Sequence, residues 1–230
     1  MDLLRLKLGI TNCYLLRAEQ GYIMVDAGSL RKVKCFQRLL KEMGILPKSI
    51  KLIIVTHAHY DHIGSLAEIK KLCDCQVLAH PLEARIMREG EIVIPPGTNP
   101  LGRMLSSIGQ KAAPLLAYPS VDSEIIVQAE YGLEEYGIEG KVLPTPGHTT
   151  GSLSVLLANG NALVGDLAVN WTGLSFYPPF AERPEQIYYS WYKLCKEGAV
   201  NIFPAHGRPF AINRIEQELK KLEMLGYIMA

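Results

Sequence analysis

The sequence predicts an α/β protein, in which short apolar strands alternate with amphipathic helices. Three observations indicate this class. Short apolar runs, such as residues 51–55, are bounded by glycine, proline or polar residues and are typical of strands. Other segments carry apolar residues at helical spacing, as Ile187, Trp191 and Leu194 do. The composition, 48% hydrophobic and 20% charged, is that of a globular chain and excludes a disordered one.

We interpret residues 1–230 as one domain, because no linker, low-complexity segment or residue-level repeat divides them. The net charge of +1 and the lack of a long basic run argue against partners such as nucleic acid or a membrane surface. No apolar run approaches the roughly 20 residues that span a bilayer. Residues 1–5 lack a signal-peptide pattern, and the five cysteines lack a disulfide-framework spacing. We therefore expect a cytoplasmic location; the oligomeric state stays open.

The first half of the chain is expected to form strands at 3–8, 13–16, 22–25, 51–55 and 76–79. Ser29 is expected to cap a helix that ends near Gly44, with a buried face formed by Val33, Phe36, Leu40 and Met43. Gly64 is expected to open a second helix, to about residue 72. Pro81 suits the first turn of a third, over about 82–88, and His80 before it is interpreted as structural.

The segment from about 91 to 135 differs from what precedes it. Pro95-Pro96-Gly97 and Asn99-Pro100 interrupt the pattern, and helical spacing then resumes at Leu101, Met104, Leu105, Ile108 and Ala112. The segment is apolar on one face. Two interpretations stay open: an insert that forms a lid or one wall of a substrate pocket, and a packing element that only covers core.

The second half is expected to form strands at 141–143, 153–157, 162–164 and 201–203. A helix begins at Pro184 and ends before Gly198, with a core stripe of Ile187, Trp191, Leu194 and Cys195. Asn213 and Glu216 have the spacing of a capping box for a last helix, whose buried face is Ile215, Leu219 and Leu222.

Residues 56–62 carry the densest group of metal-ligand side chains in the chain. His57, His59, Asp61 and His62 follow the strand at 51–55, and three of the six histidines lie here. Open α/β sheets place their sites at the C-terminal ends of strands. Imidazole and carboxylate groups are the usual ligands of zinc and similar metals. An extended backbone would point His57 and His59 to the same side, so the stretch predicts a metal site.

The stretch resembles the His-x-His-x-Asp-His motif of the metallo-β-lactamase fold superfamily. Further segments resemble motifs of that family in the expected order: Val25-Asp26-Ala27-Gly28, Pro146-Gly147-His148-Thr149-Thr150-Gly151-Ser152, Gly165-Asp166 and Ala205-His206-Gly207. The resemblance covers nearly the whole chain. It implies the metallo-β-lactamase fold, an αββα sandwich in which two mixed β-sheets are flanked by helices.

The resemblance also implies a set of metal ligands: His57, His59 and His148 for one ion, Asp61, His62 and His206 for a second, and Asp166 as the bridge between them. We expect two divalent ions, zinc first, with iron and manganese as alternatives. Asp61 is also a candidate catalytic residue that orients the nucleophile. Asp26 is a candidate partner for the second ring nitrogen of a ligand histidine.

These residues imply a dinuclear metal-dependent hydrolase, in which a hydroxide between the two ions attacks an ester, thioester or lactone carbonyl of a small molecule. The ligand set resembles that of glyoxalase II-like hydrolases. Only 24 residues follow His206 in the 230-residue chain, too few for the helical extension that binds glutathione there. The alternatives are an iron-dependent sulfur dioxygenase that resembles persulfide dioxygenases, and a phosphodiesterase or nuclease. A binding module without catalysis would be expected to have lost ligands, and no motif residue is missing.

Three aromatic residues after Asp166 are candidates for the substrate cleft, with ordinary core as the alternative: Trp171, Phe176 and Tyr177. By resemblance to some lactone-cleaving relatives, Tyr177 is a candidate donor to an oxyanion. Cys73-x-Cys75 is a weak metal motif and is interpreted as structural. The other cysteines, Cys13, Cys35 and Cys195, have the pattern of small hydrophobic residues.

Overall fold

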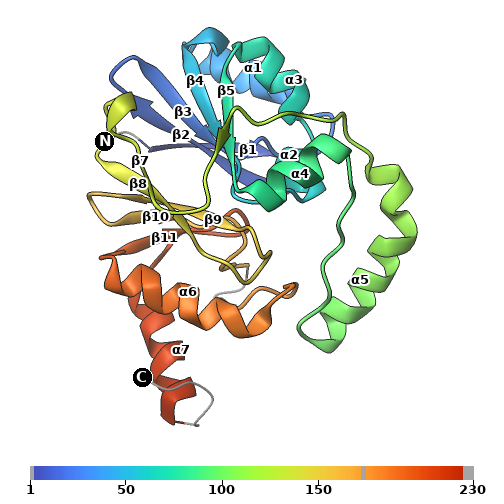
Figure 1. The fold of residues 1–230 in the computed structure, drawn as a ribbon, viewed down its shortest axis with the longest axis vertical. Coiled ribbons are helices and arrows are strands. Elements are labelled where there is room, and N and C mark those ends of the chain that lie inside the picture. Colours follow the sequence, from blue (N-terminus) through green and yellow to red (C-terminus); the bar gives the residue numbers. More distant parts are fainter. Residues whose placement is uncertain (1–2, 172–174, 225–230) are drawn as a thin grey trace.

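The computed structural model describes residues 3–171 and 175–224, which form an αββα sandwich (Figure 1). In order across the first sheet lie β1 (Leu3–Leu8), β2 (Thr11–Ala18), β3 (Gly21–Val25), β4 (Ile50–Ile54), β5 (Gln76–Ala79) and β6 (Ile125–Ile126). Across the second lie β12 (Phe210–Ala211), β11 (Asn201–Phe203), β10 (Asn161–Leu163), β9 (Leu153–Leu157), β8 (Gly140–Pro144) and β7 (Tyr131–Gly132). Both sheets are mixed, which confirms the expected architecture.

The helices of the described residues lie mainly outside the sheets. They are α1 (Val33–Glu42), α2 (Tyr60–Ile63), α3 (Leu66–Cys73), α4 (Pro81–Glu89), α5 (Pro100–Ala112), α6 (Pro184–Lys196) and α7 (Asn213–Met224). Helices α1 and α3 cover the first sheet, and α6 covers the second (Figure 1). None of these helices has both the length and the apolar composition needed to cross a membrane.

Apolar side chains fill three layers, because each inner strand is covered on both faces. On β4, Leu52 and Ile54 face the second sheet, where they meet residues such as Val155. Ile53 faces the other way, into a cluster with Phe36 of α1. Successive side chains of a strand point to opposite faces. A strand buried on both faces therefore has a continuous apolar sequence, as residues 52–55 do after the exposed Lys51 of β4.

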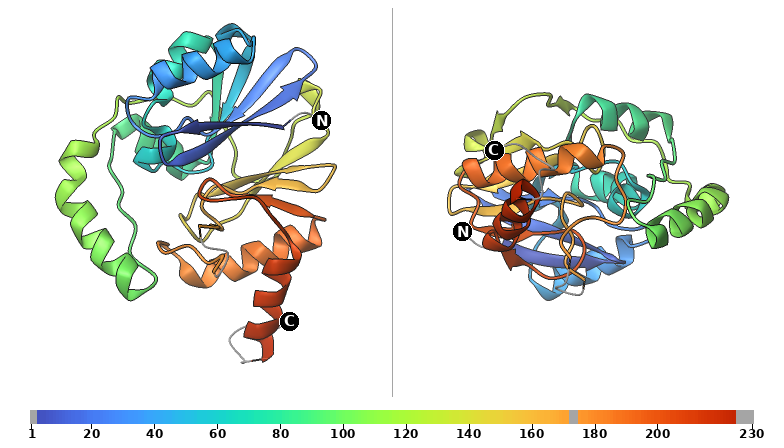
Figure 2. Two further views of the ribbon diagram at one scale, coloured as in Figure 1. Left: turned by 180° about the vertical axis from the view of Figure 1, so that it is seen from behind. Right: turned by 90° about the horizontal axis from the view of Figure 1, so that it is seen from below.

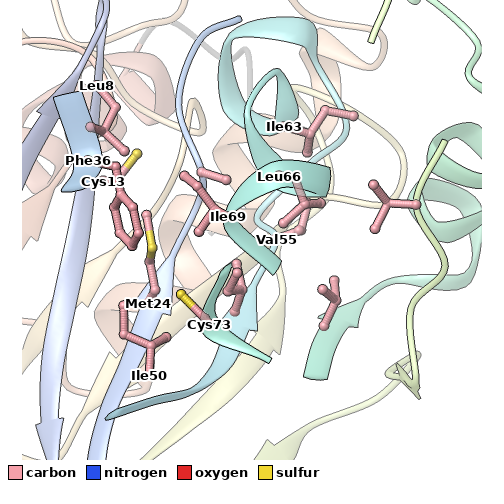
Figure 3. Close-up of a cluster of buried hydrophobic side chains, with 14 of the residues drawn as sticks. Leu8, Cys13, Met24, Phe36, Ile50, Val55, Ile63, Leu66, Ile69 and Cys73 are labelled. Carbon is pink, nitrogen blue, oxygen red and sulfur yellow. The ribbon is translucent and has the colours of Figure 1, made fainter. Parts of the chain in front are cut away.

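The layer under α1 and α3 accounts for two of the cysteines (Figure 3). Cys13 and Cys73 are buried there beside Met24 and Phe36, and all five cysteines are free thiols. This packing supports the interpretation of Cys13 as a small hydrophobic residue and of Cys73 as structural. On the second sheet, Trp191 of α6 is fully buried, and its indole N–H donates to the Leu167 carbonyl at 3.0 Å.

Two predicted helix starts are wrong. Helix α1 begins at Val33 and not near Ser29. The reason is that Ser65, which lies between α2 and α3, holds residues 29–32 by hydrogen bonds. The Ser65 hydroxyl donates to the Ser29 carbonyl at 2.6 Å and accepts the Lys32 N–H at 2.8 Å. Met43, expected on the buried face of this helix, is 36% exposed. These long-range contacts leave no local pattern in the sequence.

Helix α7 begins at Asn213 itself, so Asn213 is not the residue that caps it. The first-turn amides of Ile215 and Glu216 donate instead to the carbonyl of Ile212. Ile215 and Leu219 are buried as predicted, whereas Leu222 is half-buried. At α4 the prediction of a structural role for His80 is confirmed, because its Nδ1 accepts the Leu82 N–H at 3.3 Å.

The segment 91–135 has two parts. Helix α5 stands to one side of the sandwich, as the views from behind and below show (Figure 2). The later part returns to the body, where β6 pairs with β5 and β7 pairs with β8. The two short strands were missed by the sequence pattern, because two-residue strands have no readable alternation.

Candidate metal centre

The predicted ligand residues all follow the C-terminal ends of strands. His57 and His59 come directly after β4, and the short helix α2 carries Asp61 and His62. From the second sheet come three more residues, after β8, β10 and β11 respectively: His148, Asp166 and His206. The centre therefore lies at one end of the sandwich, where loops of both sheets meet.

The structure brings these seven side chains together in three overlapping groups. Within each group the ligand atoms lie within 4.8 Å of one another: His57, His59 and His148; His57, His62 and Asp166; and Asp61, His62 and His206. The first and third groups are the two sets that the sequence analysis expects. Asp166 lies between them, with Oδ2 3.6 Å from His148 Nε2 and 3.4 Å from His206 Nε2.

Hydrogen bonds fix the orientation of the rings through their Nδ1 atoms. The Nδ1–H of His148 donates to the Phe180 carbonyl at 2.8 Å, and that of His206 to the Ile10 carbonyl at 3.2 Å. His62 Nδ1 bonds to Asp26 Oδ2 at 2.8 Å. When Nδ1 carries the proton, Nε2 of a neutral imidazole offers a lone pair. In these histidines Nε2 is therefore the nitrogen directed to the centre, where His148 Nε2 lies 3.0 Å from His59 Nδ1 and His206 Nε2 lies 3.1 Å from Asp61 Oδ2.

Asp26 orients two histidines, one directly and one through Thr56. Its carboxylate accepts the Thr56 N–H at 2.9 Å and the Thr56 hydroxyl at 2.9 Å, in addition to the bond with His62. The hydroxyl proton is thereby used, so the Thr56 oxygen is free to accept the Nδ1–H of His57 at 3.1 Å. The contact expected between Asp26 and a candidate ligand histidine is thus present, and Thr56 is an addition that the sequence analysis missed.

The residues present fit divalent metal ions. Six buried side-chain atoms have no hydrogen-bond partner among the described residues, and four of the six belong to the predicted ligands: His57 Nε2, His59 Nε2, His62 Nε2 and Asp166 Oδ1. Buried polar atoms are normally bonded, so a group of unbonded acceptors requires an explanation. Nitrogen and carboxylate oxygen donors that converge without a thiolate suit zinc, iron and manganese.

Burial and neighbouring charges shift the pKa values of the candidate ligands in both directions. Burial, with the neighbouring histidines, lowers the pKa of His57 well below its usual value and that of His59 to about 3. Burial alone would raise the pKa of Asp61, but the charges of His62 and His206 lower it to about 2. For His206 burial alone would lower the pKa, but the Asp166 and Asp61 carboxylates raise it to about 9. Without a bound ion, His57 and His59 are therefore neutral at neutral pH and Asp61 is ionised, whereas His206 carries a proton that a bound cation would have to displace.

Glu83 of α4 is a second residue that the sequence analysis missed. It is 2% exposed and connects two ligand loops. Its Oε2 accepts the N–H of Ala58 at 2.7 Å, and its Oε1 accepts the hydroxyl of Thr149 at 2.8 Å. Ala58 lies between His57 and His59, and Thr149 follows His148 in sequence. A carboxylate in an otherwise ordinary helix gives no sequence signal for such a connection.

A cavity of about 350 Å³ opens above the centre. Its floor includes the candidate ligands His59, Asp61, His148, Asp166 and His206. Of the three aromatic candidates, Trp171 lines it and is 58% exposed. Phe176 is buried in the core of the second sheet, and the Tyr177 hydroxyl donates to the Pro184 carbonyl at 2.9 Å. The structure does not bring these two to the cavity, and Tyr60, which the sequence analysis did not select, lines it instead.

Comparison with known proteins adds independent information. Residues 6–198 match the sequence profile of the metallo-beta-lactamase superfamily. The chain is 31% identical over 165 residues to the probable metallo-hydrolase YflN of Bacillus subtilis, covering 70% of this chain and 61% of YflN. It is 30% identical over 158 residues to the probable metallo-hydrolase MJ0888 of Methanocaldococcus jannaschii, covering 68% of this chain and 66% of MJ0888. The alignments thus span slightly less than two thirds of these relatives.

The fold is shared with solved structures. One is TTHA1623, a crystal structure in a di-iron-bound form, with a TM-score of 0.65 and 23% identity. The alignment covers 95% of this chain and 98% of TTHA1623. At this identity the likeness shows the fold alone.

Proposed function

Because this chain belongs to the metallo-beta-lactamase superfamily, we propose that it is a hydrolase that holds two divalent ions and cleaves an ester, thioester or lactone of a small molecule. The names of YflN and MJ0888 support a metal-dependent hydrolase in general. One observation carries the finer proposal: two groups of three ligand side chains converge on either side of one carboxylate, Asp166.

In this proposal His57, His59 and His148 hold one ion, Asp61, His62 and His206 hold the other, and Asp166 bridges them. When bound, the ions lower the pKa of coordinated water towards about 7 and polarise a carbonyl oxygen. Zinc is the first expectation, and iron and manganese are the alternatives.

Asp61 is the proposed catalytic residue among the ligands. Its low pKa keeps the carboxylate ionised at neutral pH, so it accepts a hydrogen bond from the attacking water and orients it. Thr11 fixes its position, because the Thr11 hydroxyl donates to the Asp61 backbone carbonyl at 2.7 Å and lies 3.3 Å from Oδ2. Asp61 Oδ2 also lies 3.1 Å from His206 Nε2.

The alternative is an iron-dependent sulfur dioxygenase. The same nitrogen and oxygen donors suit iron, and TTHA1623, which shares the fold, has been seen in a di-iron-bound form. The two functions differ in what they consume, because a hydrolase uses water and a dioxygenase uses molecular oxygen.

Metal analysis of protein purified without added metal, combined with activity assays, separates the two. We expect two bound ions per chain, hydrolysis of thioesters or lactones, and loss of activity on chelation. Oxygen uptake is measured in parallel with a persulfide substrate. Bound iron together with oxygen consumption and no hydrolysis would overturn the hydrolase proposal.

The variant His59→Ala tests the centre itself. Activity is expected to fall by more than about a hundredfold, because even a misplaced catalytic group costs about this much. The control is His80→Asn, which replaces a histidine outside the centre and keeps a side chain that caps α4. Circular dichroism establishes that both variants fold. A folded His59→Ala protein with wild-type turnover would contradict the assignment.

A further inference from the structure

The walls of the cavity are apolar. The segment before α5 supplies Val93, Ile94 and Pro95, α5 supplies Leu105 and Ile108, and the facing wall includes Val169, Trp171, Pro178, Pro179 and Phe180. Among the described residues that line the cavity there is no lysine or arginine. The two basic residues of α5, Arg103 and Lys111, are exposed and do not line it. Apart from the metal centre, the described lining therefore offers no positively charged side chain to an anionic group.

Helix α5 packs through its small residues on Pro179 and on the segment 94–95 that precedes it. A Cβ at Gly102 would lie 2.3 Å from the Pro179 carbonyl oxygen, and one at Gly109 would lie 3.2 Å from Ile94. Between them, the Ser106 hydroxyl donates to the Pro95 carbonyl at 2.8 Å. Gly102, Ser106 and Gly109 recur at helical spacing, so one face of α5 makes this contact.

Larger apolar side chains of α5 are left partly exposed at the cavity. Leu105 is 45% exposed and Ile108 is 57% exposed, and both line the cavity. Covering apolar surface of this kind with an apolar group lowers the free energy. These two side chains line the same cavity as the metal centre, which lies at its floor.

We propose that the cavity selects a neutral carbonyl compound with an apolar acyl or alkyl chain, which lies between residues 93–95 and the side chains of Leu105 and Ile108. This inference rests on the proposed hydrolysis. In that reaction the oxygen of water bonds to the carbonyl carbon, and the bond to the leaving oxygen or sulfur breaks. The leaving group keeps the electron pair and takes a proton from the water.

The size and charge of the cavity limit the substrate. About 350 Å³ is near the lower end of the roughly 300–1,000 Å³ of small-molecule sites, which favours a chain of moderate length. A carboxylate or phosphate in the chain would lose its water without gaining a cation from the walls. Thioesters with carboxylates outside the reacting carbonyl, such as glutathione thioesters, are therefore expected to be poor substrates.

A series of neutral p-nitrophenyl esters, from acetate to decanoate, tests the inference on the zinc-loaded full chain. We expect kcat/KM to rise by about fourfold per added methylene until the cavity is filled, and then to level off. A hexanoate ester with a terminal carboxylate is expected to react about tenfold more slowly or worse than its neutral counterpart, because its charge is desolvated.

Two variants of α5 locate the effect. Ile108→Asp places a charge at the cavity, whereas Met104→Asp places it on the same helix at a residue that is 54% exposed and does not line the cavity. The ratio of decanoate to acetate kcat/KM is expected to fall about tenfold or more in Ile108→Asp and to stay at the wild-type value in Met104→Asp. Hydrolysis with no dependence on chain length would overturn the inference and leave the hydrolase proposal intact.

A binding measurement tests the cavity without catalysis. The neutral fluorophore N-phenyl-1-naphthylamine is bound to metal-free protein and displaced with decanol. Wild-type protein and Met104→Asp are expected to bind decanol alike, and Ile108→Asp about tenfold more weakly. If the three proteins bind decanol in this way but hydrolyse none of the esters, the apolar site is supported and the hydrolase proposal is overturned. Equal binding to all three proteins would overturn the apolar site.

Discussion

At the scale of single residues, the centre depends on the groups behind the candidate ligands. His62, His148 and His206 each use Nδ1 for a bond to the protein, with Asp26, Phe180 and Ile10 respectively. Such bonds fix the tautomer and the ring orientation of a metal-binding histidine. Asp26 has a further constraint, because its φ of 60° places it in the left-handed region. Asparagine and aspartate are the side chains that tolerate this conformation best.

The variant Asp26→Asn tests this support without disturbing the backbone. An amide cannot accept from both Thr56 and His62 as the carboxylate does, so the affinity for zinc is expected to fall by roughly 10- to 100-fold. Competition with a chromophoric chelator measures it. The control is Asp74→Asn, which makes the same change at an exposed residue with a φ of 57°. Equal zinc affinities in the two variants would show that Asp26 does not support the centre.

Glu83→Gln tests the connection between the two ligand loops. One carboxylate oxygen becomes an NH₂ group that faces a donor, either the Ala58 N–H or the Thr149 hydroxyl. We expect a loss of about 1–3 kcal/mol in the free energy of unfolding, the usual cost of an unsatisfied buried donor. Zinc affinity is expected to fall as well.

Urea denaturation and zinc titration measure the two effects. The control is Glu89→Gln on the same helix, where an exposed ion pair with Arg85 is worth less than about 1 kcal/mol. If Glu83→Gln lowers the stability but leaves zinc affinity at the wild-type value, Glu83 supports the fold without positioning the loops.

At the scale of elements, α5 is the α-helix of the described residues that has the least support from the core. It contributes no residue to the three buried apolar clusters, and its contact with the body runs through Gly102, Ser106 and Gly109. Elements with few buried apolar contacts open at lower free energy than the core. Helix α5 is thus the element from which a lid movement is expected, and this stays a prediction.

The variant Gly102→Val tests how α5 is held. The added side chain cannot fit beside the Pro179 carbonyl, so α5 is expected to separate from the body while the sheets stay intact. Hydrogen exchange is expected to become faster in residues 93–112 and to stay unchanged in β3 and β4. The control is Ser107→Ala on the exposed side of the helix. Uniformly faster exchange across both sheets would mean that α5 supports the whole fold.

At the scale of the molecule, the centre connects the two halves of the sandwich. Its candidate ligands come from loops that follow β4 in the first sheet and β8, β10 and β11 in the second. An ion bound by both sets favours the folded state only, because the unfolded chain has no such site.

Metal removal is therefore expected to lower the melting temperature. Free zinc at 100 times its Kd adds about 2.7 kcal/mol to the stability. For a chain of this size each kcal/mol raises Tm by roughly 2–4 °C, so we expect a difference of roughly 5–11 °C between zinc-loaded and chelator-treated protein. Differential scanning calorimetry measures it, with His59→Ala as the control that responds less. An identical Tm with and without zinc would contradict a site between the sheets.

The sequence by itself determined the features that local pattern encodes. The apolar run of β4 and the cluster of His57, His59, Asp61 and His62 after it are visible in consecutive residues. Spacing also located α6 and its buried Trp191. Residue type and short-range periodicity are sufficient here, because a buried strand must be apolar and these four candidate ligands lie within residues 57–62.

Only the tertiary structure decided how distant residues meet. Glu83 joins the loops of Ala58 and Thr149, and Ser65 holds the chain before α1. The cavity wall at α5 depends on the contact of Gly102 with Pro179. These contacts join residues that are 25 or more positions apart, as Ala58 and Glu83 are. Their cause is the packing of one layer on another, which no local sequence pattern records.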